Sequence, residues 1–265
     1  MSDCGYQSVD REFYAGRDAA TRPSAEAVVS ILLENFRPTS AVDLGCGVGT
    51  WLSVLRARGV TEIYGLEADE VPIELLKIPP ECFERADLRR PVELSRTFDL
   101  ALSLEVAEHL PASAAAPFVA SLVKLAPVVL FSAAIPDQGG IHHVNEQWPQ
   151  YWCGLFAGQG YVMIDGIRRR IWRNEDVKVW YRQNILMFAR HEMLESHAGL
   201  RRAFVGTDIE WVDRVHPKLF IERVESYERR LKALQNPTMR EVLRMFPGAA
   251  RRRARGWFKR AWGRQ

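Results

Sequence analysis

The sequence predicts an α/β protein with a seven-stranded, mostly parallel sheet, helices on both faces and a helical C-terminal extension. Between residues 41 and 132, short apolar segments alternate with amphipathic ones, and a glycine-rich turn follows the first apolar segment. Beyond residue 191 the alternation stops and only helical patterns remain. Strands that alternate with helices are joined by right-handed crossovers, which give a parallel sheet covered on both faces.

Each element is expected from its own local pattern. The seven expected strands are residues 41–44, 62–66, 82–85, 98–104, 127–132, 161–167 and 185–189. A first helix is expected to begin at Ser24, which follows Pro23 and can cap free backbone N–H groups. Further helices are expected over residues 51–58, 71–77, 112–125 and 148–159, and a later one carries an apolar stripe at Val224, Tyr227, Leu231 and Leu234.

The length and composition suit one α/β domain with additions. We expect an N-terminal lid or arm over residues 1–23, the main domain over 24–190, a helical extension over 191–248 and a basic tail over 249–265. No apolar run approaches the roughly 20 residues that span a bilayer. The four cysteines lack metal-binding spacing and the N-terminus lacks a secretory pattern, so a cytoplasmic protein is expected.

The charge is unevenly divided along the chain. The net charge is +3, but residues 249–265 hold seven basic residues and no acid, which leaves −4 for the rest. An enzyme of nucleic acids would spread basic residues over its body, so no nucleic-acid partner is expected. The tail also contains Trp257, Phe258 and Trp262, a mixture that suits peripheral contact with an anionic membrane; a merely solubilising end is the alternative.

A glycine-rich turn follows the first expected strand. The run A-V-D-L-G-C-G-V-G-T places Asp43 at the strand end, where such sheets bind ligands, and Gly45, Gly47 and Gly49 before a helix. Glycines let the chain turn sharply and let a ligand lie against the backbone, and the helix start offers free N–H groups. A dinucleotide fingerprint would need its last glycine at Thr50, so it fits less well.

This run resembles motif I, D-x-G-x-G-x-G, of the class I S-adenosylmethionine-dependent methyltransferases, which have a Rossmann-like fold. The resemblance covers roughly residues 24–190 and implies S-adenosylmethionine as the cofactor. It further implies that Glu67, or else Asp69, accepts the ribose hydroxyls, and that Asp87 binds the adenine amino group while the N–H of Leu88 reaches the ring.

The segment S-L-E-V-A-E-H-L at the end of the fourth strand resembles the family's motif at that place. The resemblance implies that Glu105 lies near the methionine part of the cofactor. Glu108 and His109 are expected instead to cap or brace the following turn. The expected cofactor-binding residues are therefore Asp43, Gly45, Gly47, Gly49, Glu67, Asp87, Leu88 and Glu105.

A second polar run follows the fifth strand and faces the same sheet edge. Residues 134–148 read A-I-P-D-Q-G-G-I-H-H-V-N-E-Q-W, similar to bacterial small-molecule and sugar O-methyltransferases. An imidazole suits the deprotonation of a hydroxyl, so His143, and after it His142, is the expected general base. In one alternative the histidines bond to the loop backbone while Asn145 and Glu146 cap the next helix. In another, His142, His143 and Glu146 hold a metal that binds a diol, but adjacent histidines usually point apart, so no metal site is predicted.

The stretch 171–184 is rich in aromatic, amide and guanidinium groups, which together suit a polyhydroxylated ligand. We expect Glu146, Trp180, Gln183 and Asn184 near the acceptor; a packed hairpin is the alternative.

The expected function is methyl transfer to a hydroxyl of a sugar, glycan precursor or other polar small molecule. One alternative is N- or O-methylation of a natural-product or lipid-linked acceptor. Another is a catalytically silent fold that binds a partner through the stripe at Leu231. The sequence leaves open whether the protein forms a homodimer.

Overall fold

A computed structural model describes residues 14–68 and 71–235. The chain divides into two compact units, residues 1–219 and residues 220–265. The expectations for Asp69, for residues 1–13 and for the basic tail over 249–265 lie outside the described residues.

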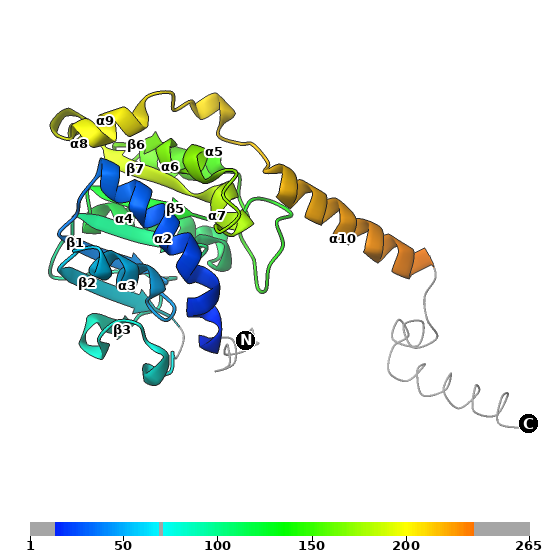
Figure 1. Cartoon of the computed structure of the whole chain (residues 1–265), viewed down its shortest axis with the longest axis horizontal. Coiled ribbons are helices and arrows are strands. Elements are labelled where there is room, and N and C mark those ends of the chain that lie inside the picture. The colour runs from blue at the N-terminus through cyan, green and yellow to red at the C-terminus, as the bar shows by residue number, and fades with distance from the viewer. Residues whose placement is uncertain (1–13, 69–70, 236–265) are drawn as a thin grey trace, which may run out of the picture. The chain divides into compact units, whose positions relative to one another are not determined.

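The first unit is built on one seven-stranded sheet with the order β3-β2-β1-β4-β5-β7-β6 (Figure 1). The strands are β1 (Ser40–Leu44), β2 (Glu62–Glu67), β3 (Phe83–Arg85), β4 (Leu100–Leu104), β5 (Val128–Ser132), β6 (Tyr161–Ile164) and β7 (Leu186–Arg190). Strands β1 to β5 pair in parallel, and β7 runs antiparallel to both β5 and β6. The predicted seven-stranded, mostly parallel α/β sheet is confirmed.

Helices occupy the connections between strands and the region after β7. The α-helices are α2 (Arg17–Asn35), α3 (Thr50–Ala57), α4 (Ala115–Leu125), α5 (Pro149–Ala157), α6 (Gly166–Ile171), α7 (Val179–Asn184), α8 (His191–Ser196), α9 (Ala198–Phe204) and α10 (Pro217–Gln235). Short 3-10 turns are η1 (Ile73–Leu75), η2 (Pro80–Cys82), η3 (Ala107–His109), η4 (Ala112–Ala114) and η5 (Ile209–Trp211).

The sheet is buried on both faces because successive side chains of each strand point to opposite sides. On β1, Ala41 packs into the core formed with α2, α3, α6 and α9, whereas its neighbour Val42 packs into the core formed with α4 and α5. Both cores are continuous across the sheet, so the carboxyl ends of β1, β2, β4 and β5 are held rigidly at one edge.

The prediction that the first helix begins at Ser24 is wrong. Helix α2 begins at Arg17, and Pro23 lies inside it. The side chain of Asp18 pairs with Arg22 one turn later, which supports the added turns. Ser24 is fully buried and accepts a hydrogen bond from the backbone of Lys178, so it ties α2 to a later segment instead of capping the helix.

The helix expected over residues 71–77 is also wrong, because only η1 forms there. Seven residues are too few for a helix that is stable by itself, and Pro79 disfavours helical backbone at the residue before it. In addition, the N–H of Lys77 donates to the carbonyl of Val48, so the segment is bonded to the glycine-rich turn.

The hairpin alternative for residues 171–184 is wrong as well, since the strand expected over 161–167 ends at Ile164 and two helices follow. A buried ion pair fixes this region: Arg168 donates to both carboxylate oxygens of Asp165, at 3.0 and 2.8 Å. Arg168 also donates to the carbonyls of Gln183 and Val212, so it holds α6, α7 and the segment after η5 together.

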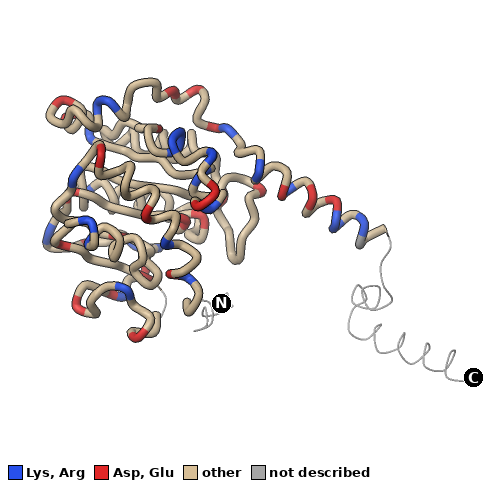
Figure 2. Tube along the Cα trace, in the orientation of Figure 1, with Lys and Arg blue, Asp and Glu red and all other residues tan. Residues whose placement is uncertain are grey.

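Helix α10 supplies the described part of the second unit, and the predicted apolar stripe is on it. Acidic and basic residues are interspersed along the helix (Figure 2). Its exposed apolar residues are Phe220, Ile221, Val224, Tyr227, Leu231 and Leu234. Neither this helix nor any other in the described part of the chain has the length and apolar character needed to cross a bilayer.

Candidate active site

The three glycines after β1 have different structural roles. All three have positive φ angles, +90° at Gly45, +53° at Gly47 and +81° at Gly49. A Cβ at Gly45 would lie 2.3 Å from a Val106 methyl, and one at Gly49 would lie 2.9 Å from the Ile78 side chain, so packing excludes a side chain at both. A Cβ at Gly47 would meet nothing within 4 Å, so this glycine faces the open space in which a ligand can lie against the backbone.

Two carboxylates stand beside this loop. Glu67, at the end of β2, accepts hydrogen bonds from the N–H groups of Gly47 (2.7 Å) and Ala68 (2.8 Å). Asp43 is 1% exposed, and neither of its carboxylate oxygens has a hydrogen-bond partner among the described residues. Burial, and after it the negative charge of Glu67, raises the pKa of Asp43 to about 7. The loop is therefore lined by acids, which favours a ligand with positive charge.

Asp87 and Leu88 follow β3 at the same edge. Asp87 is one-third exposed and pairs with Arg89 at 2.7 Å, which lowers the pKa of its carboxyl. The side chain of Leu88 is buried in the core, which fixes its backbone beside Asp87. An adenine amino group would therefore compete with Arg89 for the carboxylate of Asp87. The ion pair of Asp87 with Arg89 is worth little, because it is exposed to water.

Glu105 follows β4 in a strained backbone conformation. Its φ is +58°, uncommon for a residue with a side chain, and such strain concentrates at functional sites. Its carboxylate accepts hydrogen bonds from Gln138 (3.1 Å) and Asn184 (3.0 and 3.2 Å), and Asn184 also donates to Gln138. Burial raises the pKa of Glu105. Residues after β4, after β5 and on α7 thus meet in one polar cluster.

The loop after β5 folds back over η3. The N–H groups of Val144 and Asn145 both donate to the carbonyl of Glu108. In this loop, Nδ1 of His143 lies 2.8 Å from Oε1 of Glu146, and Glu146 also accepts the N–H groups of Asp137 and Gly139. His143 is thus oriented by a carboxylate that is itself fixed to the loop backbone, whereas His142 is exposed with a φ of +62°.

Glu146 bonds to the loop backbone, whereas the alternative interpretation of this run gave that bonding to the histidines and made Glu146 a helix cap. The cap is not formed, however, because the helix starting at Pro149 has no side-chain cap at Trp148. Sequence reasoning missed the contact of His143 with His109, whose rings meet edge to face at 4.8 Å. Burial, and after it the charge of His143, lowers the pKa of His109 to about 4.

The remaining residues expected near the acceptor lie on α7. Asn184 joins the Glu105 cluster as described. Gln183 is fully buried and bonds to the backbone of Arg214 and His216, so its amide is occupied by the chain itself. Trp180 is half-buried against Ile135 and Val179. The structure brings Asn184, Glu146 and His143 to the carboxyl edge and leaves Gln183 in the core.

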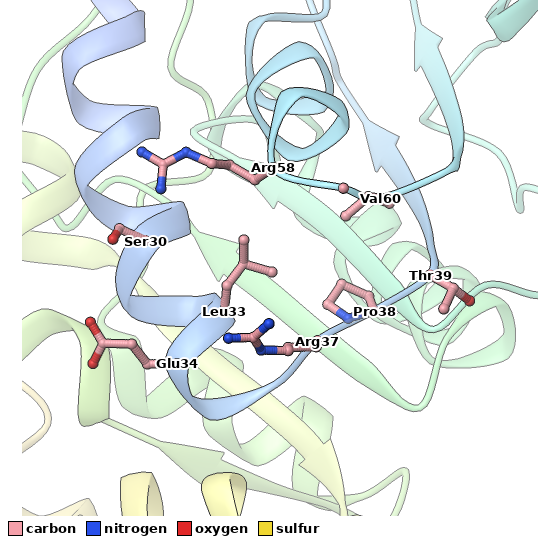
Figure 3. Close-up of a pocket in the computed structure, with 9 residues that line it drawn as sticks. Ser30, Leu33, Glu34, Arg37, Pro38, Thr39, Arg58 and Val60 are labelled. Atoms are coloured by element: carbon pink, nitrogen blue, oxygen red, sulfur yellow. The ribbon is translucent and has the colours of Figure 1, made fainter.

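A surface pocket of about 590 Å³ lies elsewhere (Figure 3). It is lined by the end of α2 and by Thr39 and Val60, which precede β1 and β2. These positions put it at the amino ends of the strands, opposite to the edge with the glycine-rich loop and the polar cluster. It is therefore separate from the candidate active site.

Comparisons with known proteins agree with this fold. Residues 17–173, more than half of the chain, match the family model of the methyltransferase domain. A solved structure of the sugar N-methyltransferase KedS8 from Streptoalloteichus sp ATCC 53650 superposes with a TM-score of 0.54 at 16% identity, over 72% of this chain and 96% of that one. Streptomyces venezuelae DesVI gives a TM-score of 0.50 at 16% identity, over 69% of this chain and 99% of that one. No protein of curated function matches the sequence.

The chain therefore belongs to the methyltransferase domain family, and its cofactor is S-adenosylmethionine. The residues present fit this cofactor. Gly47 leaves the loop open, Glu67 presents a carboxylate at the end of β2, and the buried acid Asp43 lies beneath them.

Proposed function

We propose that the protein transfers a methyl group from S-adenosylmethionine to a hydroxyl of a sugar, a glycan precursor or a similarly polar small molecule. The observation that carries the proposal is the pair formed by His143 and Glu146, held at the same sheet edge as the glycine-rich loop. One structure of similar fold is that of a sugar N-methyltransferase, which supports a sugar as the acceptor but not the choice of a hydroxyl over an amine.

Different residues would bind the cofactor and the acceptor. Gly47, Glu67, Asp87 and the backbone of Leu88 would hold the nucleoside part of the cofactor, and Glu105 would lie towards its methionine part. When bound, S-adenosylmethionine supplies a methyl group activated by a positively charged sulfur. In the transfer, the acceptor oxygen would bond to the methyl carbon as the carbon–sulfur bond breaks, and the electron pair of that bond would remain on sulfur.

The acceptor hydroxyl must lose its proton during this transfer. His143 is the group that we propose to promote this loss, because Glu146 fixes its Nδ1 and leaves Nε2 to act. The amides of Gln138 and Asn184 bond to Glu105 and hold the acceptor side of the cluster in place. Positioning of this kind contributes much of the rate of a two-substrate reaction.

The runner-up is methylation of an amino group on a sugar, natural-product or lipid-linked acceptor. A neutral amine attacks without prior loss of a proton, so it has less need of His143. The test is methyl transfer from radiolabelled S-adenosylmethionine to a panel of sugar nucleotides and matched aminosugar nucleotides. We expect a hydroxyl acceptor, and His143→Ala should lower its rate by roughly 10² to 10⁴ while affinity for S-adenosylhomocysteine stays within a few-fold. Transfer to amines alone, unaffected by the substitution, would favour the runner-up.

A further inference from the structure

Glu108, His109 and His143 form a cluster in which each residue offers one metal-ligating atom. These three atoms all lie within 4.8 Å of one another. A point central to three atoms at that spacing is about 2.8 Å from each, so shifts of well under 1 Å would give the 2.0–2.2 Å typical of metal–nitrogen and metal–carboxylate bonds. Glu108 and His109 come from η3 and His143 from the loop after β5, so the cluster joins two segments at the carboxyl edge.

Glu108 is the unusual member of the cluster. It is fully buried, and both carboxylate oxygens lack a hydrogen-bond partner among the described residues. Burying a carboxylate costs free energy, and the nearby backbone N–H groups of Glu108 and Ala134 offset only part of that cost. A bound cation beside Glu108 would remove this cost, and the neighbouring histidines are the ligands that could share it.

The surroundings hold the cluster in the arrangement of a metal site. Nδ1 of His143 donates to Glu146, which fixes the ring and leaves Nε2 as the ligating nitrogen, and carboxylate–histidine pairs of this kind commonly orient metal ligands. Glu105 and Glu146 add negative charge near Glu108, whereas Arg17 is the basic residue that acts on His109. Three acids and two imidazoles therefore surround one small volume.

We infer that Glu108, His109 and His143 bind a first-row divalent transition-metal ion such as Mn²⁺, Fe²⁺, Co²⁺ or Zn²⁺. Two imidazole nitrogens and one carboxylate favour these ions over Mg²⁺ and Ca²⁺, which prefer all-oxygen sites. Three protein ligands leave coordination positions open. This inference differs from the predicted absence of a metal, and its ligands differ from the set His142, His143 and Glu146, because His109 replaces the exposed His142.

The inference rests on the proposed function in one respect, the ligand that would fill the open positions. An acceptor hydroxyl bound to the ion would have a lowered pKa and would release its proton to water more readily. In that case His143 promotes proton loss by holding the ion, not by taking the proton on its own ring.

The test uses the full chain, first freed of metal by dialysis against a chelator. Titration with Mn²⁺ followed by calorimetry should give one ion per chain, and Co²⁺ should give an absorption spectrum typical of nitrogen ligation. Ca²⁺ should bind at least tenfold more weakly than Mn²⁺. Absence of Mn²⁺ binding, or a Co²⁺ spectrum equal to that of the aqueous ion, would overturn the inference without any variant.

Variants then identify the ligands. Glu108→Gln, which keeps the shape of the side chain, and His143→Ala should each weaken Mn²⁺ binding at least tenfold, and Glu146→Gln should weaken it by roughly 10- to 100-fold. The matched control is His142→Ala, the exposed neighbour, which should change Mn²⁺ affinity by less than twofold. An effect of His142→Ala as large as that of His143→Ala would contradict this ligand set. S-adenosylhomocysteine binding is measured on the same samples. If the native chain does not bind S-adenosylhomocysteine, the proposed function is contradicted. If the native chain binds S-adenosylhomocysteine but not Mn²⁺, only this inference is contradicted.

Discussion

Asp43 couples the stability of the cofactor-free protein to pH. Its carboxyl group is almost fully buried without hydrogen-bond partners among the described residues, and its pKa is raised from the ordinary 3.8 to about 7. The folded state therefore binds a proton that the unfolded state releases between these two values. The contribution of Asp43 to the free energy of unfolding is complete below pH 3.8 and is lost as pH rises through 7.

The size of this effect follows from the two pKa values. Between pH 5 and pH 8, Asp43 should lower the free energy of unfolding by about 2 to 3 kcal/mol. Asp43→Asn keeps the shape of the side chain and removes its titration, so this part of the pH dependence should disappear. Any constant cost of burying the amide cancels, because only the change between pH 5 and pH 8 is compared.

The assay is urea unfolding of the native chain and of the variant at pH 5, 6, 7 and 8 without cofactor. The matched control is Asp99→Asn. Hydrogen bonds from Thr39 and Ser40 outweigh desolvation and lower the pKa of Asp99, so both of its pKa values lie below this window and its removal should leave the slope unchanged. Equal slopes for the native chain and Asp43→Asn would refute the reasoning.

Three further predictions follow from the site and the core. Glu67→Ala should weaken S-adenosylhomocysteine binding at least tenfold by calorimetry, since charge-assisted hydrogen bonds are worth about 1.5 to 3 kcal/mol each. If Glu67→Ala leaves the affinity unchanged and Asp69→Ala abolishes binding, the carboxylate that binds the ribose is that of Asp69, not of Glu67. Asp165→Ala should lower the free energy of unfolding by about 3 to 5 kcal/mol, because it leaves Arg168 buried without its ion pair; a loss below 1 kcal/mol in urea unfolding would contradict this. Deleting residues 249–265 should leave the melting temperature and S-adenosylhomocysteine binding unchanged while abolishing any binding to anionic vesicles; loss of folded protein would place the tail in the core.

The sheet and the acidic side chains at its carboxyl edge could be predicted from the sequence because they depend on local patterns. Each buried strand is a short apolar run, and an acidic side chain lies at its carboxyl end, as Asp43 and Glu67 do. In a parallel sheet the carboxyl ends share one edge, so spacing along the chain converts into proximity in space.

The metal cluster could not be predicted in the same way. His109 and His143 meet only because the N–H groups of Val144 and Asn145, in the loop after β5, bond to the carbonyl of Glu108, which is 36 and 37 positions earlier in the chain. The start of α2 was missed for a related reason. Pro23 is a helix-start signal in isolation, but the tertiary bond from Lys178 to Ser24 and the pair of Asp18 with Arg22 support a longer helix.

The central claim is that the edge formed by Gly47 and Glu67 holds S-adenosylmethionine. It is tested most directly by calorimetric titration of the native chain with S-adenosylhomocysteine, followed by competition with NAD⁺. We expect one binding site per chain for S-adenosylhomocysteine and no displacement by NAD⁺. Absence of binding by folded protein, or displacement by NAD⁺ at comparable concentration, would contradict it.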